Sequence, residues 1–203
     1  MTELETRAAY ALWAPHYPPT PHNALMHVEQ AAVLSLLPPM QGVLVLDAGC
    51  GTGRYTALLR SHGARVCSID RSRPMIAQAQ SPRRVLGDLR ALPIASATLD
   101  VVVCGLALND VISLTPVMYE FARVLRPGGV LITSLIHARG AEARWTRTFQ
   151  AAGSTWALPA HWHSLADHQR AGRDAGFAIE RWLEPEIPGQ RGPVALVVRA
   201  LQT

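Results

Sequence analysis

Short apolar runs alternate with stretches of helical periodicity along most of this chain. Residues 43–47 and 99–104 are almost continuously apolar, which is typical of strands buried on both faces of a parallel sheet. Between such runs, segments such as residues 54–61 space their apolar positions as a helix does. The alternation predicts an α/β fold in which helices cover both faces of a Rossmann-like, doubly wound sheet.

The predicted sheet has seven strands, and its last two are connected differently from the others. They are joined only by a loop rich in Pro and Gly, which is too short for a crossover helix, so one of them runs antiparallel. The sheet is therefore mostly parallel with an antiparallel C-terminal hairpin strand. The predicted strands are residues 43–47, 64–70, 83–87, 99–104, 130–136, 177–183 and 194–201. Helices are predicted at residues 54–61, 74–80, 116–125 and 165–175.

Residues 1–40 precede the first strand and predict an N-terminal helical arm. Its two helical patterns, residues 3–13 and 23–37, are separated by four prolines between positions 15 and 21, which a helix interior does not accommodate. The arm carries aromatic and histidine side chains at its hinge. We predict that it is a lid over a domain formed by residues 41–203.

Residues 138–163 form a second unusual segment, an irregular stretch between the fifth strand and the last helix. Long insertions in compact domains are usually functional lids or substrate loops. This one contains Trp145, Phe149 and Trp156. We expect it to lie on the substrate side of the same sheet edge as the arm.

Composition narrows the chemistry. All 19 basic residues are arginines, and lysine is absent. Nucleotide-binding P-loops and pyridoxal-phosphate enzymes both require a lysine, so neither class fits. Hydrophobic residues make up 49% and charged residues 17% of the 203 positions, so the chain can build the core of one folded domain.

Charge and cysteine usage predict where the protein works. The net charge is +4, but the arginines of residues 71–90 have no interleaved aromatics and predict a solvated face. The N-terminus is acidic where a leader would be basic, and the longest apolar stretch, residues 99–108, falls far short of the ~20 residues of a membrane span. Three cysteines without a CxxC pair suit a reducing compartment. We expect a cytoplasmic monomer or homodimer that binds neither nucleic acid nor membranes.

The segment Asp47-Ala-Gly-Cys-Gly-Thr-Gly53 carries the main chemical signal. Its three glycines follow a strand and open a helix, so bare backbone lines the edge at which parallel sheets bind ligands. A dinucleotide-binding fingerprint would place its third glycine at position 54, which is Arg54 here. Asp70, at the end of the next strand, suits a carboxylate that accepts ribose hydroxyls. This feature alone does not tell a dinucleotide-binding protein from another protein that binds a nucleoside.

The pattern Asp-x-Gly-x-Gly-x-Gly resembles motif I of the class I S-adenosylmethionine-dependent methyltransferases. Gly87-Asp-Leu89 before the fourth strand and residues 120–129, Glu-Phe-Ala-Arg-Val-Leu-Arg-Pro-Gly-Gly, before the fifth extend the resemblance. Together they are similar to the type 11 subgroup, which includes ubiquinone-pathway and malonyl-carrier methyltransferases. The resemblance covers about residues 41–136. It implies methyl transfer from S-adenosyl-L-methionine to a small-molecule acceptor, with S-adenosyl-L-homocysteine as the product.

The resemblance also implies how the cofactor is held. The glycines would lie under its methionine part and Asp47 would orient its amino group. Asp70 would bind the ribose, Asp88 the adenine amine, and the backbone of Leu89 the adenine ring. The predicted cofactor-binding residues are Asp47, Gly49, Cys50, Gly51, Gly53, Asp70, Arg71, Asp88, Leu89 and Leu106.

The acceptor pocket is expected between the arm and the segment 138–163, where aromatic faces suit a cation or a planar substrate. The predicted substrate-binding residues are Tyr10, Trp13, Tyr17, Asn109, Trp145 and Trp156. A phenol, alcohol or protonated amine needs a base within hydrogen-bond reach, although methyl transfer itself needs no nucleophile on the protein. His137, at the end of the fifth strand, is the first candidate base, and His22 and His163 are the next.

No metal is expected. Asp110 could be a first magnesium ligand, but the fifth strand ends in Ile136-His-Ala138, which lacks a second. His161, His163, Asp167 and His168 are spaced like metal ligands, yet histidines beside a tryptophan are more often packing or substrate contacts.

Two other functions stay open at this point. The first is a NAD(P)-dependent Rossmann oxidoreductase, which the position of Gly53 weakens. The second is a cofactor-binding subunit without turnover, which the intact glycines and acids weaken. Nucleobase and protein-amide methyltransferases are disfavoured, because the fourth strand is followed by Gly105-Leu-Ala-Leu-Asn109 and not by Asn/Asp-Pro-Pro-Tyr.

Overall fold

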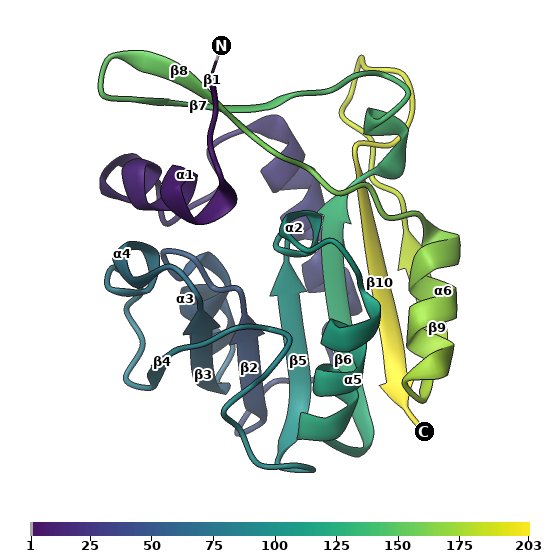
Figure 1. Cartoon of the computed structure of the whole chain (residues 1–203). Helices are drawn as coiled ribbons and strands as arrows, with labels where there is room; N and C mark the ends of the chain where they lie inside the picture. Colours follow the sequence, from purple (N-terminus) through teal and green to yellow (C-terminus); the bar gives the residue numbers. More distant parts are fainter. Residues whose placement is uncertain (1) are drawn as a thin grey trace.

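The centre of the molecule is a seven-stranded sheet with the strand order β4-β3-β2-β5-β6-β10-β9 (Figure 1). We describe residues 2–203 from a computed structural model. The strands are β2 (Leu44–Ala48), β3 (Arg65–Asp70), β4 (Arg84–Leu86), β5 (Leu99–Gly105), β6 (Leu125–Ile136), β9 (Phe177–Leu183) and β10 (Ala195–Gln202). The first five pair in parallel, and β10 runs antiparallel between β6 and β9. The predicted fold class and its antiparallel hairpin strand are confirmed.

Helices cover both faces of this sheet. Successive side chains of each strand point to opposite faces, and apolar side chains on both faces have to be buried. Val45 of β2 belongs to a core that includes Val33 and Leu59, whereas its neighbour Leu46 packs in a second core with Phe121. The first core is covered by α2 (Ala24–Leu36) and α3 (Arg54–Ser61), and the second by α5 (Thr115–Val124) and α6 (Leu165–Asp174). The predicted helix at residues 74–80 is shorter, because α4 spans only Arg73–Ile76.

A second, three-stranded sheet has the order β1-β8-β7 and lies beyond the C-terminal edge of the large sheet (Figure 1). Its strands are β1 (Thr2–Glu3), β7 (Arg147–Ala151) and β8 (Ser154–Leu158). The expectation that residues 138–163 are irregular is therefore wrong for the hairpin. Ala152 and Gly153 both have positive φ, 51° and 72°, as a two-residue hairpin turn requires. The expected helix at residues 3–13 also begins later, because Glu3 belongs to β1.

The N-terminal arm is clamped between this small sheet and the loops of the large one. Its first helix, α1 (Thr6–Trp13), packs Ala9 against Phe149, and Trp13 stacks on Phe149 with 4.8 Å between ring centroids. On the opposite side, Gln78 Nε2 donates to the Ala14 carbonyl (2.5 Å). The arm therefore packs against both the small sheet and the loops of the large sheet.

Candidate active site

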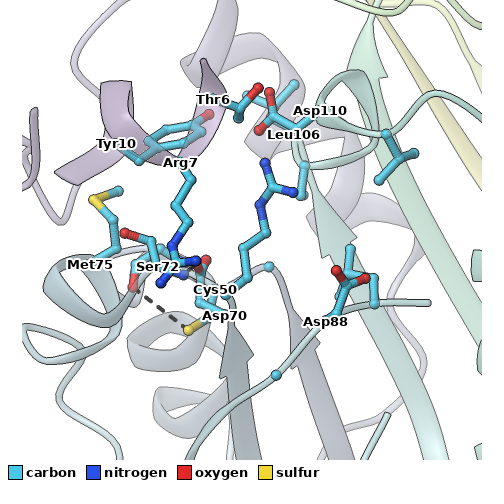
Figure 2. Close-up of a pocket in the computed structure, with 18 of the residues that line it drawn as sticks. Thr6, Arg7, Tyr10, Cys50, Asp70, Ser72, Met75, Asp88, Leu106 and Asp110 are labelled. Carbon is cyan, nitrogen blue, oxygen red and sulfur yellow. Dashed lines mark hydrogen bonds between the residues drawn. The ribbon is translucent and has the colours of Figure 1, made fainter. Parts of the chain in front are cut away.

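A cavity of about 370 Å³ lies between α1 and the C-terminal ends of β2, β3 and β5 (Figure 2). Its lining includes all but one of the predicted cofactor-binding residues. These are Asp47, Gly49, Cys50, Gly51, Asp70, Arg71, Asp88, Leu89 and Leu106. The crevice beyond the strand ends is where open α/β sheets bind ligands.

At Gly49 and Gly51 the glycine turn brings bare backbone to the cavity, next to the side chains of Cys50 and Thr52. Gly49 has φ of +72°, and a Cβ there would lie 2.5 Å from the Cβ of Ala107. Gly53, the predicted residue that does not line the cavity, begins α3 with φ of +94°, and its Cβ would lie 3.0 Å from that of Ala79. The three glycines therefore have different roles. Gly49 and Gly51 line the cavity, and Gly53 allows α3 to begin.

Asp70 is held in place by the turn that it faces. Its Oδ2 accepts from the backbone N of Gly51 (2.8 Å), and its Oδ1 accepts from that of Ser72 (2.7 Å). Burial raises the pKa of Asp70 against the lowering effect of these two donors. Each carboxylate oxygen keeps a lone pair for a further donor, so the group can accept a ribose hydroxyl at each oxygen.

Asp47 lies deeper, at the end of β2. Its side chain is fully buried and accepts from Thr56 Oγ1 (2.5 Å). Burial raises the pKa of Asp47 to about 6. An ammonium group placed beside it would favour the ionised form, because opposite charges lower a carboxyl pKa.

The adenine side of the predicted site is formed by two loops. Asp88 lines the cavity but already pairs with Arg90, whose Nη2 donates to Oδ2 (2.7 Å), and this contact lowers the pKa of Asp88. Leu106, with φ of +57°, is fixed by its N–H, which donates to the carbonyl and to the hydroxyl of Ser134. These two hydrogen bonds fix the backbone of Leu106, which lines the cavity.

A buried polar network beneath the cavity was missed by the sequence analysis. Glu29 of α2 is fully buried and accepts from Arg54 Nη1 (3.0 Å), from Tyr55 Oη (2.7 Å) and from Ser134 Oγ. Arg54 and Tyr55 both line the cavity. A glutamate in an amphipathic helix pattern reads as a solvent-facing residue, so only its partners, 25 or more positions away, identify its role.

The end of the cavity nearest α1 has a second set of charged and polar groups. Arg147 of β7 donates to Asp110 Oδ1 (2.6 Å), to the hydroxyl of Tyr10 (2.8 Å) and to the Pro159 carbonyl (3.1 Å). Figure 2 shows Tyr10 and Asp110 at this end, with Asp70 at the other. Burial and the neighbouring Asp110 carboxylate raise the pKa of Tyr10, so its hydroxyl stays protonated while it accepts from Arg147.

The three candidate bases do not line this cavity. His137 contacts Glu184 (3.1 Å), and His163 is buried with Nε2 2.9 Å from the Val111 carbonyl. His22 is exposed and packs edge-on against Tyr17. Among the described residues, His161 is the histidine that lines the cavity, whereas its spacing in the sequence suggested only a metal ligand.

The predicted substrate-binding residues separate into two groups. Tyr10 and Tyr17 line the cavity, whereas Trp13, Trp145 and Trp156 do not. Trp13 and Trp156 pack with the small sheet, and Trp145 lies beside Arg139. The buried amide of Asn109 bonds to Ile136 and to the His161 carbonyl, so it joins chain segments and is not free for a substrate.

The residues that are spaced like metal ligands in the sequence have separate structural roles. Asp167 completes the capping box of α6, and His168 is buried between α6 and the sheet. Within residues 2–203, no three His, Cys, Asp or Glu side chains gather as a metal site would need. None of the helices in this range is long and apolar enough to span a membrane.

Comparison with known sequences identifies the kind of protein to which the cavity belongs. The family profile described as "Methyltransferase domain" matches residues 46–133. A malonyl-[acyl-carrier protein] O-methyltransferase from Enterobacter lignolyticus is 33% identical over 193 residues, which are 93% of this chain and 69% of that enzyme. The similarity thus extends well beyond the glycine turn, into the arm and the small sheet.

Solved structures agree on the fold. A putative S-adenosylmethionine-dependent methyltransferase from Listeria monocytogenes superposes with a TM-score of 0.74 at 23% identity, covering 87% of this chain and 99% of that one. A magnesium protoporphyrin IX methyltransferase from Synechocystis, crystallised with S-adenosylhomocysteine, gives 0.70 at 21% identity, covering 97% and 94%. At these identities the likeness concerns the fold.

Proposed function

This chain belongs to the class I S-adenosylmethionine-dependent methyltransferases, and we propose that it methylates the free carboxylate of a malonyl thioester carried on an acyl carrier protein. The observation that carries the proposal is the 33% identity to a malonyl-carrier O-methyltransferase over 93% of the chain. The expected small-molecule acceptor is thereby replaced by a small acyl group on a protein partner. Membership of this family also sets aside the oxidoreductase and the inactive binding subunit.

A carboxylate acceptor fits the absence of the candidate bases from the cavity lining. At neutral pH a malonyl carboxylate is already ionised, so no residue has to remove a proton from it. S-adenosylmethionine, when bound, supplies an activated methyl group for in-line displacement by the carboxylate oxygen. The protein then has to bind both reactants, orient them and exclude water.

The cavity offers donors for such a carboxylate at its α1 end. The Tyr10 hydroxyl, which stays protonated beside Asp110, can donate to it, and the guanidinium of Arg147, which donates to this hydroxyl, polarises it. Arg54 adds a second cation: its Nη1 bonds to Glu29 and Gln30, and within residues 2–203 its Nε and Nη2 make no hydrogen bond. Since Arg54 lines the cavity, these donors can reach a bound anion.

The other end suits the cofactor. Asp70 can accept the ribose hydroxyls, Asp47 can pair with the ammonium group, and Leu89 and Leu106 border the place of the adenine ring. Tyr10 and Tyr17 line the same cavity and would enclose the acceptor. With the cofactor and the acceptor held in one cavity, proximity and orientation would supply most of the rate.

The test is direct. Purified protein, S-adenosylmethionine and malonyl-acyl carrier protein should yield S-adenosylhomocysteine and a carrier heavier by one methylene, as measured by mass spectrometry. Acetyl-acyl carrier protein, which lacks the free carboxylate, is the matched control and should stay unchanged. Methylation of both carriers, or of neither while the cofactor still binds, would contradict the proposal.

A further inference from the structure

A second hollow joins the cavity on its acceptor side. It has a volume of about 480 Å³, within the ~300–1,000 Å³ of typical ligand sites. We call it the entry groove. Its lining residues are Ile112, Ser113, Leu114, Thr115, Ala160, His161, Trp162, His163, Asp167, Arg170 and Ala171. Three of these, Ile112, Ser113 and His161, also line the cavity, so the two spaces meet there.

The walls of the entry groove are held by hydrogen bonds between distant segments. The His161 N–H donates to the Asn109 carbonyl (2.9 Å), and the Asn109 amide returns a bond to the His161 carbonyl (3.1 Å). His163 Nε2 lies 2.9 Å from the Val111 carbonyl. These contacts fix residues 161–163 against residues 109–111, so the groove is a built feature of the fold.

The groove changes character from its inner to its outer end. Ile112, 82% exposed although large and apolar, stands where the groove meets the cavity, together with the polar Ser113 and His161. Arg170 lies on α6 with 70% of its side chain exposed, and its partner Asp167 also serves as the α6 cap. Arg170 Nη2 donates to Asp167 Oδ1, so its Nε and Nη1 are the donors left for an anion. An elongated ligand with apolar and amide parts and an anionic end would match these groups.

We propose that the entry groove receives the 4′-phosphopantetheine arm of the acyl carrier protein, with the phosphate near Arg170 and the thioester at Ile112 and Ser113. The inference rests on the proposed function, because that arm is the link between a carrier protein and its malonyl group. It adds the route and the recognition of the linker to that function. The malonyl carboxylate would then arrive at the cavity from the side of His161.

The first test reverses the charge at the outer end. Arg170→Glu should raise the KM for malonyl-4′-phosphopantetheine on the order of tenfold, since a surface-site attraction becomes a repulsion. Its KM for malonyl-pantetheine, which lacks the phosphate, should change less than twofold. Arg173→Glu is the matched control, because Arg173 is exposed on the same helix but does not line the groove, and it should leave both KM values unchanged.

The second test fills the middle of the groove. Ala160 lines the groove but not the cavity, so Ala160→Trp should raise the KM for both pantetheine thioesters while sparing the short S-methyl malonyl thioester. Cofactor affinity, measured by calorimetry, should stay within twofold and shows that the variant is folded.

The outcomes separate the two proposals. If the unmodified enzyme methylates malonyl thioesters but Arg170→Glu affects both pantetheine substrates alike and Ala160→Trp affects long and short thioesters alike, the groove is not the route. If the unmodified enzyme binds the cofactor and methylates no malonyl thioester, the proposed function fails, and the groove assignment fails with it.

Discussion

The two ends of the cavity are built in different ways. We call the end with Asp47 and Asp70 the cofactor end and the end with Tyr10 and Arg147 the acceptor end, after the functions proposed for them. The cofactor end comes from the C-terminal ends of four neighbouring parallel strands, β4, β3, β2 and β5, and from the loops that follow them. The acceptor end comes from segments far apart in the sequence: Arg147 and Tyr10 are 137 positions apart, and β1 pairs with β8. Local motifs can therefore encode the first end, whereas the second exists only when the arm and the hairpin meet.

Because the two ends of the cavity are held by different contacts, we expect that the binding site of one reactant can be lost while the other is kept. Asp70 is held by the backbone amides of Ser72, in its own loop, and of Gly51, in the glycine turn, so we expect its position to survive changes in the arm. Tyr10 and Arg147 depend on packing between α1 and the small sheet, where Ala9, Phe149 and Leu158 form a separate core. Four predictions test this separation, from the largest expected effect to the smallest.

Deleting residues 2–21 should abolish the acceptor end. Methyl transfer should fall on the order of 100-fold or more, because Tyr10 and Tyr17 are lost and water enters the site. The large sheet keeps its core, so a cooperative thermal unfolding transition should remain. Deleting residues 2–3 alone removes β1 but keeps α1 and should cost less. Full methyl transfer by the longer deletion would show that the arm is not a lid.

Asp70→Asn should damage the cofactor end alone. The amide cannot accept at both positions, so S-adenosylmethionine affinity should fall by about 2–3 kcal/mol, or roughly 30- to 150-fold in Kd. Calorimetry measures the affinity, and Asp174→Asn, an exposed carboxylate on α6, is the control. An unchanged Kd in Asp70→Asn would refute the ribose assignment.

Tyr10→Phe should damage the acceptor end alone. It keeps the ring and removes the hydroxyl that accepts from Arg147, so kcat/KM for the malonyl thioester should fall by about 2 kcal/mol, on the order of 30-fold. The Kd for S-adenosylmethionine should stay within twofold. Tyr119→Phe, at an exposed tyrosine, is the matched control. A parallel loss of cofactor affinity would mean that the two ends are coupled.

The pH dependence of cofactor binding should report on Asp47. Burial raises the pKa of this carboxyl to about 6, so the free protein holds it protonated below that pH. Binding an ammonium group requires the ionised form, so affinity should weaken about tenfold between pH 7 and pH 5. In Asp47→Asn this pH step should disappear, whereas a step of equal size would assign the titration to another group.

Sequence alone predicted the large sheet, and it predicted that the glycine turn and its aspartates meet at the edge where the cavity lies. Continuous apolar runs mark buried parallel strands, and the turn from Asp47 to Gly53 needs positive φ at positions that only glycine occupies easily. These are signals within one strand, turn and helix, so they are legible without knowledge of the partners. The roles expected of Asp47, Asp70 and Asp88 came from the resemblance of these segments to the methyltransferase family.

Only the tertiary structure decided the acceptor end. The hairpin of β7 and β8 has no strong turn signal in the sequence. Its apolar face is buried only by packing against α1, which lies about 140 positions earlier. Glu29 and Arg147 read as solvated charges until their buried partners come together. Conversely, His22, His137 and His163 looked like catalytic bases because residue type is visible in a sequence. Whether a side chain faces a cavity is set by long-range packing, which leaves no local pattern to read.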